Sequence, residues 1–433
     1  MRWENPLSQL IILGFVCCFI VGVYNVYYGI GTIGTLSPEI SRHITIALYA
    51  SCSVFGIIAG SINNMLGPRI SIIVGGLSYI LYVFLLWTYT KIENTELTVT
   101  GSVLVGFGSA LLWAAAGMIV TSYPMENQKG RFFGIFWILF NIGAFLGGFL
   151  PLLDFDFQIV TISFLCLMAF GVMITYFLIS PAQVIRDDGS RVTSKTGFSI
   201  AHELRQLVHA FTNRKLLFLW PMFLYSNWFY SYRFGDMNGT FFSPRTRTFN
   251  NIFYWASQML GAFTFGQFLD NPLFVRSKRA TIGLAFIGVF YTTTWLGCLF
   301  VEIKYVNEAN SEMVDILDDQ YTSLLVLFLL SGFSDAMLQT WCYWIIGTLT
   351  NNAMILSRYA GIYKAIQSAG TAIAWYLDAE AVIPTAVIGI NWALLYVAIA
   401  FSYVVARQVS DTNYTFMEPT HSPEGTYDSP EVR

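Results

Sequence analysis

Two segments that lie half a chain apart decide the fold: GSINNMLGPR at residues 60–69 and GQFLDNPLFVRSKR at residues 266–279. In each segment a glycine is followed four positions later by Asn64 or Asp270, and basic residues come before the next apolar run. Glycine lets two helices approach closely, and an Asn or Asp side chain can accept hydrogen bonds at the N-terminus of a neighbouring helix. The repeat therefore predicts a duplicated loop that latches two halves of a helix bundle. The predicted gate residues of the two loops are Gly60, Asn64, Arg69, Gly266, Asp270 and Arg276.

The composition around these segments is that of a membrane protein. The chain of 433 residues is 55% hydrophobic and only 11% charged, whereas a soluble domain carries about 25% charged residues. The net charge of −3 leaves no basic excess for binding nucleic acid. The six cysteines lie in apolar stretches, and the four histidines have no metal-ligand spacing. We therefore expect no nucleic-acid partner, no metal, no cofactor and no enzymatic activity.

Twelve apolar runs of about 20 residues each are continuous rather than alternating, which predicts an all-α polytopic membrane protein. The runs cover residues 9–33, 43–62, 70–90, 99–121, 131–152, 157–179, 215–235, 249–269, 281–302, 321–346, 354–378 and 385–406. They divide six and six around a polar segment. The predicted domains are an N-terminal six-helix half at 1–179, a cytosolic linker at 180–214, a C-terminal six-helix half at 215–406 and a disordered cytosolic tail at 407–433. With the duplicated loop, this organisation resembles the major facilitator superfamily, although Asn64 replaces the usual Asp.

Within the linker, Ser199 is a candidate N-cap for an amphipathic helix. Its apolar face would carry Ile200, Leu204, Leu207, Val208 and Phe211. Such a helix is expected to lie at the interface, on the membrane surface or on the cytosolic helix ends. The alternative is a soluble linker helix without a special role.

The distribution of basic residues predicts the orientation. With the N-terminus in the cytosol, most of the 23 Lys and Arg residues fall on the inner side, and Arg233 is among the few assigned to the outer side. Both termini are then cytosolic, in either the plasma membrane or an endomembrane. The sequon at Asn238 falls in an outer loop, which predicts a glycan there.

Two ionisable residues lie deep inside predicted spans, where charge is costly and therefore marks function. Asp335 and Lys364 lie at similar depths on consecutive antiparallel spans, so we expect them to meet as an ion pair. The pair is either a static lock or a working pair that changes protonation, and Lys364 could alternatively extend to the inner surface. Further residues predicted to line a central cavity, with helix packing as the alternative, are Gln339, Gln367, Asn25, Tyr28, Trp113, Asn141 and Asn227.

Three further segments carry a family resemblance: GFSDAMLQTWCY at 332–343, GIYKAIQSAG at 361–370 and GFGSALLW at 106–113. They resemble segments of the uncoordinated-93-like family, with fungal members closest, and the resemblance covers most of residues 10–406. It implies the major facilitator fold. The founding members of that family are regulatory subunits of a potassium channel complex, one vertebrate branch escorts receptors, and fungal members are described mainly as transporters.

These observations predict that the protein is a secondary transporter that moves a small solute by alternating access. Asp335 is the expected carrier of a proton or another cation, and the partners are the lipid bilayer and the solute. The alternative is a non-transporting regulatory subunit or escort that binds another membrane protein. A transporter needs a polar central cavity, whereas a subunit can function with a collapsed one.

Overall fold

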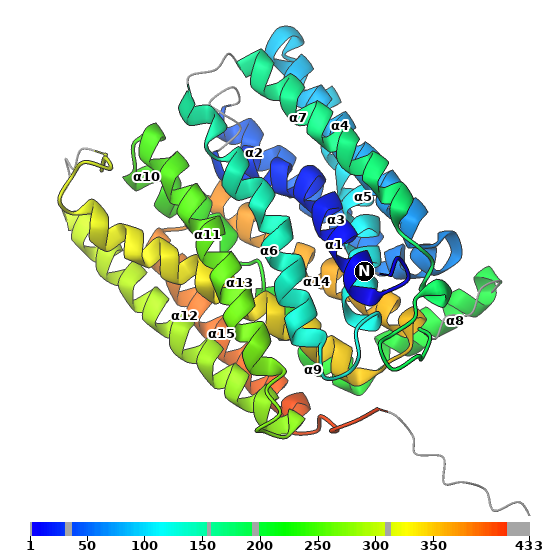
Figure 1. Ribbon diagram of the computed structural model, residues 1–433. Helices are drawn as coiled ribbons and strands as arrows, with labels where there is room; N and C mark the ends of the chain where they lie inside the picture. The colour runs from blue at the N-terminus through cyan, green and yellow to red at the C-terminus, as the bar shows by residue number, and fades with distance from the viewer. Residues whose placement is uncertain (1, 31–36, 154–156, 193–198, 308–312, 414–433) are drawn as a thin grey trace, which may run out of the picture.

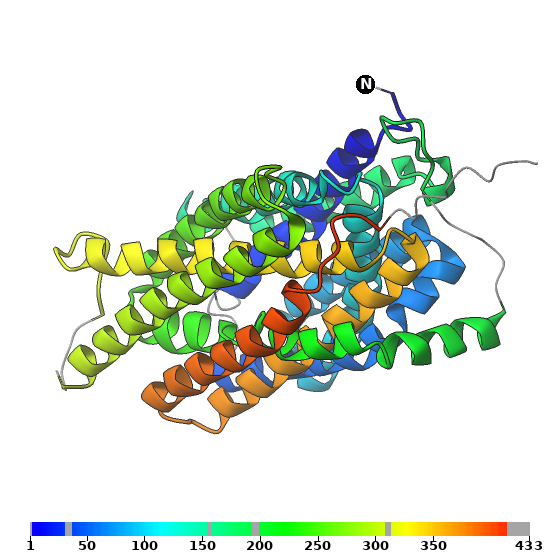
Figure 2. The ribbon, with the colours of Figure 1, turned by 90° about the horizontal axis from the view of Figure 1, so that it is seen from below.

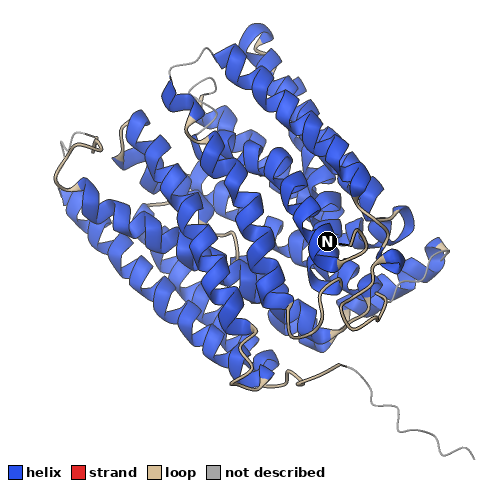
Figure 3. Cartoon of the chain, viewed as in Figure 1, coloured by secondary structure: helices blue, strands red, loops and turns tan. Residues whose placement is uncertain are grey.

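The computed structural model describes residues 2–30, 37–153, 157–192, 199–307 and 313–413. Throughout these residues the chain is helical or in loops, and the β-type pairing is limited to two isolated bridges, Ile185 with Arg191 and Phe242 with Val314. Long helices run side by side through the molecule (Figures 1 and 3). The predicted all-α class is confirmed.

Each predicted span coincides with a helix or with a broken helix. The N-terminal half consists of α1 (Pro6–Cys17), η1 (Cys18–Gly22), α2 (Val23–Ile30), α3 (Pro38–Leu66), α4 (Pro68–Ile92), α5 (Thr95–Ser122), α6 (Lys129–Gly147) and α7 (Phe157–Ile174). The C-terminal half consists of α9 (Arg214–Tyr225), η6 (Ser231–Met237), α10 (Asn238–Phe241), α11 (Pro244–Leu269), α12 (Arg276–Asn307), α13 (Tyr321–Leu349), α14 (Ala353–Ala379) and α15 (Pro384–Ala406).

The first span of each half is interrupted by a π-helical segment, η1 in one half and η6 in the other. Such segments arise where an extra residue enters a helix, and they are frequent at functional sites. In the second case the preceding helix α9 also contains Pro221, which removes a backbone donor. Both halves therefore begin with an interrupted span, which agrees with an internal duplication.

Nine helices of the described residues are long and apolar enough to cross a membrane. The three other predicted spans are the broken one from α9 to α10 and the two polar helices α11 and α14. α11 contains Asn250, Asn251 and Gln258, and α14 contains Arg358, Lys364 and Asp378. Polar residues in a spanning helix mark a protein interior or a pathway rather than a lipid contact.

Both described chain ends lie at one end of the bundle, which we call the inner face. There Ile185 donates its backbone N–H to the carbonyl of Glu4, and Asn413 donates its own to the carboxylate of Glu126. Val409 is buried and Asp411 accepts from the N–H of Arg276. Residues 407–413, which were predicted to be disordered, therefore pack against the bundle in part. The remainder, 414–433, lies outside the described residues.

The linker helix α8 (Ile200–Phe211) begins as predicted, with Ser199 accepting from the N–H of His202. It lies at the inner face and runs across the direction of the neighbouring spans (Figures 1 and 2). Leu207 is buried against the bundle, whereas Leu204 and Val208 of the expected apolar face are exposed. The helix therefore rests on the helix ends at the inner face and also presents an apolar stripe away from them.

The two halves meet through the helix pairs α3 with α14 and α6 with α11. Small residues permit both contacts, as expected for helices that pack within a membrane. A Cβ atom built on Gly60 would lie 2.5 Å from the Cα of Arg358, and one built on Gly130 would lie 2.5 Å from the carbonyl oxygen of Gly266. Gly60 and Gly266 of the duplicated loops are therefore the points of closest approach between the halves at the inner face.

We predict that Gly60→Val separates the inner ends of α3 and α14. A β-branched side chain cannot fit against the α14 backbone, and overpacking of this kind costs about 1–3 kcal/mol. The thermal unfolding midpoint of the purified protein should fall. The matched control is Gly389→Val on α15, where a Cβ meets nothing within 4 Å. Equal midpoints for the two variants would contradict the close contact.

Candidate functional site

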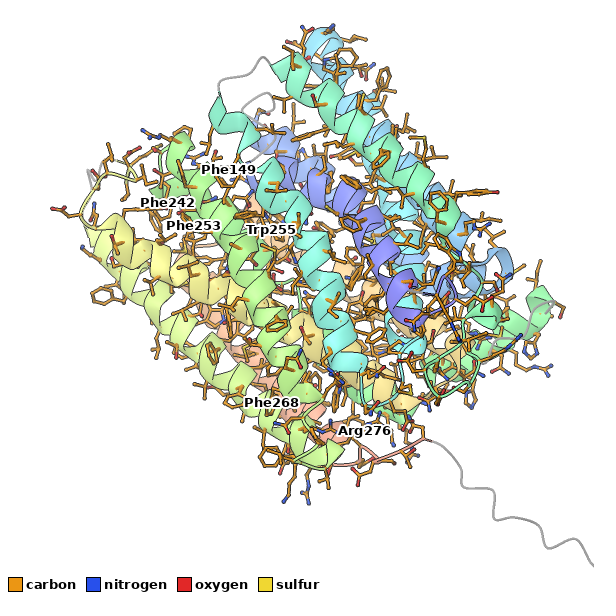
Figure 4. The ribbon with its side chains drawn as sticks, in the orientation of Figure 1. Phe149, Phe242, Phe253, Trp255, Phe268 and Arg276 are labelled. Atoms are coloured by element: carbon orange, nitrogen blue, oxygen red, sulfur yellow. The ribbon has the colours of Figure 1, made fainter. Side chains whose placement is uncertain are left out.

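A cavity of about 80 Å³ lies where the two halves meet. At roughly 10–15 Å³ for each water molecule, it has room for about five to eight waters. Both halves contribute to its lining, which includes several aromatic rings, among them Trp255 on α11 beside α6 (Figure 4). The lining residues are Val21, Tyr24, Asn25, Leu48, Tyr49, Cys52, Tyr79, Ser109, Trp113, Trp137, Phe140, Asn227, Tyr230, Trp255, Gln339, Lys364, Gln367 and Ser368.

Asp335 on α13 lies one layer behind this lining and is fully buried. Its Oδ2 accepts hydrogen bonds from the hydroxyls of Tyr230 at 2.9 Å and Tyr254 at 2.6 Å, and from Nε2 of Gln258 at 3.0 Å. Its Oδ1 accepts from Nε2 of Gln339 at 3.2 Å. Uncharged donors from three separate segments thus satisfy the carboxylate, which explains how it persists in the bundle interior.

The nearest positive charge to Asp335 in this network is Arg233, not Lys364. Nη1 of Arg233 donates to the hydroxyl of Tyr254 at 3.4 Å and to the carbonyl of Ser331 at 3.3 Å. Arg233 is only 1% exposed and therefore lies inside the bundle rather than in an exposed loop. The broken span from α9 to α10 carries it into the bundle, where its guanidinium also stacks on Phe229 at 4.8 Å.

The predicted ion pair between Asp335 and Lys364 is absent. Among the described residues, the ion pairs are Arg42–Asp378, Arg131–Asp270, Arg276–Glu126 and Arg358–Glu203. Nζ of Lys364 instead donates to Oε1 of Gln367 at 2.7 Å and lies 4.3 Å from the ring centroid of Trp113. Equal depth on adjacent helices does not make the two residues an ion pair, because their side chains point toward different neighbours.

Two glutamines connect the separated charges. Gln339 donates to Asp335 and accepts from the hydroxyl of Tyr363 at 2.7 Å, and Gln367 donates to Oε1 of Gln339 at 3.2 Å. Because Gln367 also accepts from Lys364, a chain of hydrogen bonds runs from the carboxylate through both amides to the ammonium. A change at either charged group can therefore reorient the amides between them.

The other predicted cavity residues are only partly brought together. Asn25, Trp113 and Asn227 line the cavity as expected, together with the two glutamines. Asn141 does not, because it is buried and donates to the carbonyl of Trp137 in its own helix. The side chain of Tyr28 lies outside the described residues.

At the inner face the two duplicated loops hold the halves together in different ways. Asp270 accepts the N–H of Gly130 at 2.9 Å and of Arg131 at 2.7 Å, which caps the N-terminus of α6 in the opposite half. Asn64 donates to the carbonyl of Met354 at 3.1 Å and to Glu203 at 3.3 Å. Burial raises the pKa of Asp270 to about 6, although the two N–H donors lower it, so this carboxyl is mostly ionised at pH 7.

The linker helix takes part in this closure through a buried ion pair. Glu203 of α8 accepts from Arg358 of α14 at 2.7 Å and 3.0 Å, while it also holds Asn64 of α3. One carboxylate therefore touches both halves. Arg69, by contrast, bonds to the carbonyl of Leu178 within its own half and does not reach the other half.

A second inner contact centres on Glu126, in the loop between α5 and α6. It accepts from Nδ2 of Asn351 at 2.6 Å and from the N–H of Asn413 at 2.9 Å, and it pairs with Arg276 at 3.7 Å. Arg276 lies at the inner end of α12 (Figure 4). Burial alone would raise the pKa of Glu126, but these three groups outweigh it and lower the pKa below its usual range.

The predicted glycan at Asn238 does not fit the structure. Asn238 is 1% exposed, and its side chain accepts from Asn250 at 3.0 Å and donates to the carbonyl of Arg247 at 3.5 Å. The segment expected to form an outer loop continues the broken span as η6 and α10. A sequon at such a place is not accessible in the folded chain.

Several residues of the site carry no distinctive pattern in the sequence. Tyr254 and Gln258 lie four positions apart on α11 and look like ordinary packing residues of a polar helix. Glu126 and Glu203 lie in polar segments where charge is expected. Arg233 is the exception, since an arginine within the aromatic run from 214 to 241 was a usable signal.

Comparison with known proteins gives consistent matches over most of the chain. A family model described as "Ion channel regulatory protein UNC-93" matches residues 43–402. UNC93-like protein 1 of Arabidopsis thaliana is 34% identical over 429 residues, which cover 95% of this chain and 94% of that protein.

Solved structures share the fold at low sequence identity. The major facilitator superfamily transporter FucP in the outward conformation has a TM-score of 0.63 and 16% identity, over 95% of this chain and 100% of that chain. A bacterial homologue of the iron transporter ferroportin in the outward-facing state has a TM-score of 0.66 and 10% identity, over 94% and 100%. The fold is therefore that of the major facilitator superfamily, and the chain is an integral, multi-pass membrane protein.

We predict that Glu126→Gln weakens the closed inner face. If the lost charge-assisted bonds remove about 1 kcal/mol from the closed state, its ratio to the open state falls roughly fivefold. The measurement is the labelling rate of Thr121→Cys, a buried position at the inner end of α5, in a Cys166→Ser background that removes the exposed native thiol. Glu96→Gln, exposed at the opposite end of the same helix, is the control.

The same contact predicts a pH dependence. Because the pKa of Glu126 is lowered in the closed state, its contribution is present above the ordinary pKa of about 4.3 and is lost as the pH falls through the lowered value. Labelling of Thr121→Cys, normalised to a free thiol at each pH, should stay constant above about pH 4.3 and rise as the pH falls below it. Glu126→Gln should abolish that rise, and an identical rise in the variant would rule out this carboxylate as the cause.

Proposed function

The chain belongs to the UNC-93 family, and from that premise we propose that it is a secondary transporter, with Asp335 as the carrier of a proton or another cation. The observation that carries the proposal is the buried carboxylate of Asp335, which forms no ion pair with any described residue and lies one hydrogen bond away from a central cavity. A purely structural carboxylate at such depth would be expected to have a charged partner in contact.

The donors around Asp335 suit a group that gains and loses a proton. Tyrosine hydroxyls and amide NH2 groups donate to the ionised form. A hydroxyl can accept from the protonated form after a small rotation, and an amide can do so after it turns over to present its oxygen. Arg233 lies behind Tyr254 and favours the ionised form at a distance without forming a salt bridge that would have to break. Because Gln339 both donates to Asp335 and lines the cavity, a change in the protonation of Asp335 would change the hydrogen bonds that Gln339 offers to the cavity.

In alternating access, the polar contacts between the halves would break and form again as the halves move. The inner face is closed by Asp270, Glu126 and the Glu203 clamp, each of which crosses between halves or ties the linker to both. Opening toward the inner side would break these polar contacts and leave the two bundles intact. We place the inner face in the cytosol, since most basic residues lie there, and treat residues 1–179 and 215–406 as the two rocking units.

A regulatory subunit or escort remains the second candidate function, because the description of the matched family names channel regulation. The polar cavity speaks against it, since a subunit that binds only through its surface has no need of buried, connected polar groups. Nothing in this site resembles a catalytic constellation, and we propose no enzymatic activity.

We predict that Asp335→Asn abolishes proton-driven accumulation of the solute and leaves equilibrium exchange. The amide keeps the shape and an acceptor but cannot bind and release a proton. Solutes are first identified as those whose cellular content changes between deletion and overexpressing cells, and uptake is then measured with and without a pH gradient. Asp319→Asn, in the exposed turn before the same helix, is the control.

Two results would contradict the proposal. Accumulation by Asp335→Asn that still follows the pH gradient would exclude Asp335 as the carrier. A wild-type protein that moves no solute, with Thr121→Cys equally protected under all conditions, would exclude alternating access and favour the regulatory role.

A further inference from the structure

The central cavity holds one formally charged side chain, Lys364. Of the described residues that line it, none is an Asp or a Glu. Lys364 is 6% exposed, and its ammonium has three N–H groups but one hydrogen-bond acceptor, Oε1 of Gln367. The ammonium therefore faces the cavity with donors to spare.

The positive charge of Lys364 has no contacting counter-charge. The described ion pairs all involve other residues, and the carboxylate of Asp335 is held by the tyrosines and amides around it. What surrounds the ammonium instead is aromatic, with ring centroids of Trp113 at 4.3 Å and Tyr363 at 5.3 Å. Ring faces stabilise a cation only partly, which leaves room for an anion to add a strong, charge-assisted bond.

The other side chains that line the cavity restrict the kind of solute that can bind beside Lys364. Aromatic rings from both halves, including Trp137 and Trp255, offer apolar surface next to the charge, and amides of Asn25 and Asn227 offer neutral hydrogen bonds. A cationic solute would meet the ammonium in a site of low dielectric, where like charges repel strongly. The volume of about 80 Å³ restricts the solute to a small one.

We propose that the solute is a small organic carboxylate whose anionic group binds Lys364 and whose apolar part lies against the aromatic lining. This inference rests on the proposed function, because it takes the cavity as the solute site. It also gives the Gln339–Gln367 connection a purpose, since an anion at Lys364 competes with Oε1 of Gln367 for the ammonium. A shift of Gln367 then acts through Gln339 on the donors of Asp335. A carboxylate that enters together with a proton on Asp335 moves no net charge.

The test uses matched probes on the purified full-length protein. Straight-chain carboxylates from acetate to hexanoate are compared with the amide and the amine of the same chain length, and apparent affinity is taken from ligand-induced thermal stabilisation. For at least one chain length, the carboxylate should bind roughly tenfold or more tightly than the amide, as expected for a charge-assisted bond. The amine should bind most weakly.

Two variants assign the preference to Lys364. Lys364→Gln should bring the carboxylate and the amide of the best chain length to equal affinity, and Lys364→Arg should keep the preference for the carboxylate. Retained binding of the amide shows that Lys364→Gln is folded, and Lys364→Arg keeps the test decisive if the Gln variant unfolds.

Other outcomes overturn the inference. They are a wild-type protein that binds no carboxylate better than its amide at any chain length, a preference for the amine, or a carboxylate preference that survives in Lys364→Gln. These binding results are separable from transport. Carboxylate binding through Lys364 without any alternating accessibility would retain the site and refute the transporter, whereas proton-driven movement of a different solute class would do the reverse.

Discussion

A carboxylate in the middle of a helix bundle must have its lone pairs satisfied from within the protein, and much of this structure follows from how Asp335 meets that constraint. Its donors come from the broken seventh span, from α11 and from its own helix α13. Supplying them requires polar and aromatic residues in spans that would otherwise be apolar. The polar helix α11 and the broken seventh span, neither of which is among the nine long apolar helices, supply three of these donors.

The separation of Asp335 from Lys364 has a functional meaning. A direct ion pair would neutralise both groups and couple them in a fixed geometry, and its rupture would leave two buried charges. Two glutamines connect them instead, and in the proposed transport cycle each charge would respond to its own ligand while the amides pass the change on to the other. Arg233, placed beyond Tyr254, balances the carboxylate without blocking it.

The contacts between the halves follow a different rule. Glycines bring the backbones of α3 and α14, and of α6 and α11, into contact, while polar groups at the inner face bond across the seam. Close packing is a short-range interaction and the polar contacts are few, which suits the separation of the halves that the proposed alternating access requires. The linker helix α8 takes part because Glu203 joins Asn64 and Arg358.

The sequence by itself determined the membrane class, the twelve spans, the start of α8 and the duplicated loops, because hydrophobic length, capping and glycine spacing are local properties. It also placed Gln339, Gln367, Lys364, Trp113, Asn25 and Asn227 at one cavity. Only the tertiary structure decided which groups meet. Asp335 bonds to Tyr230 and Tyr254 rather than to Lys364, because the direction of each side chain decides its partner and depth along a helix does not reveal that direction. Arg233 and Asn238 are buried in the bundle because the π-helical interruption of the seventh span carries them inward.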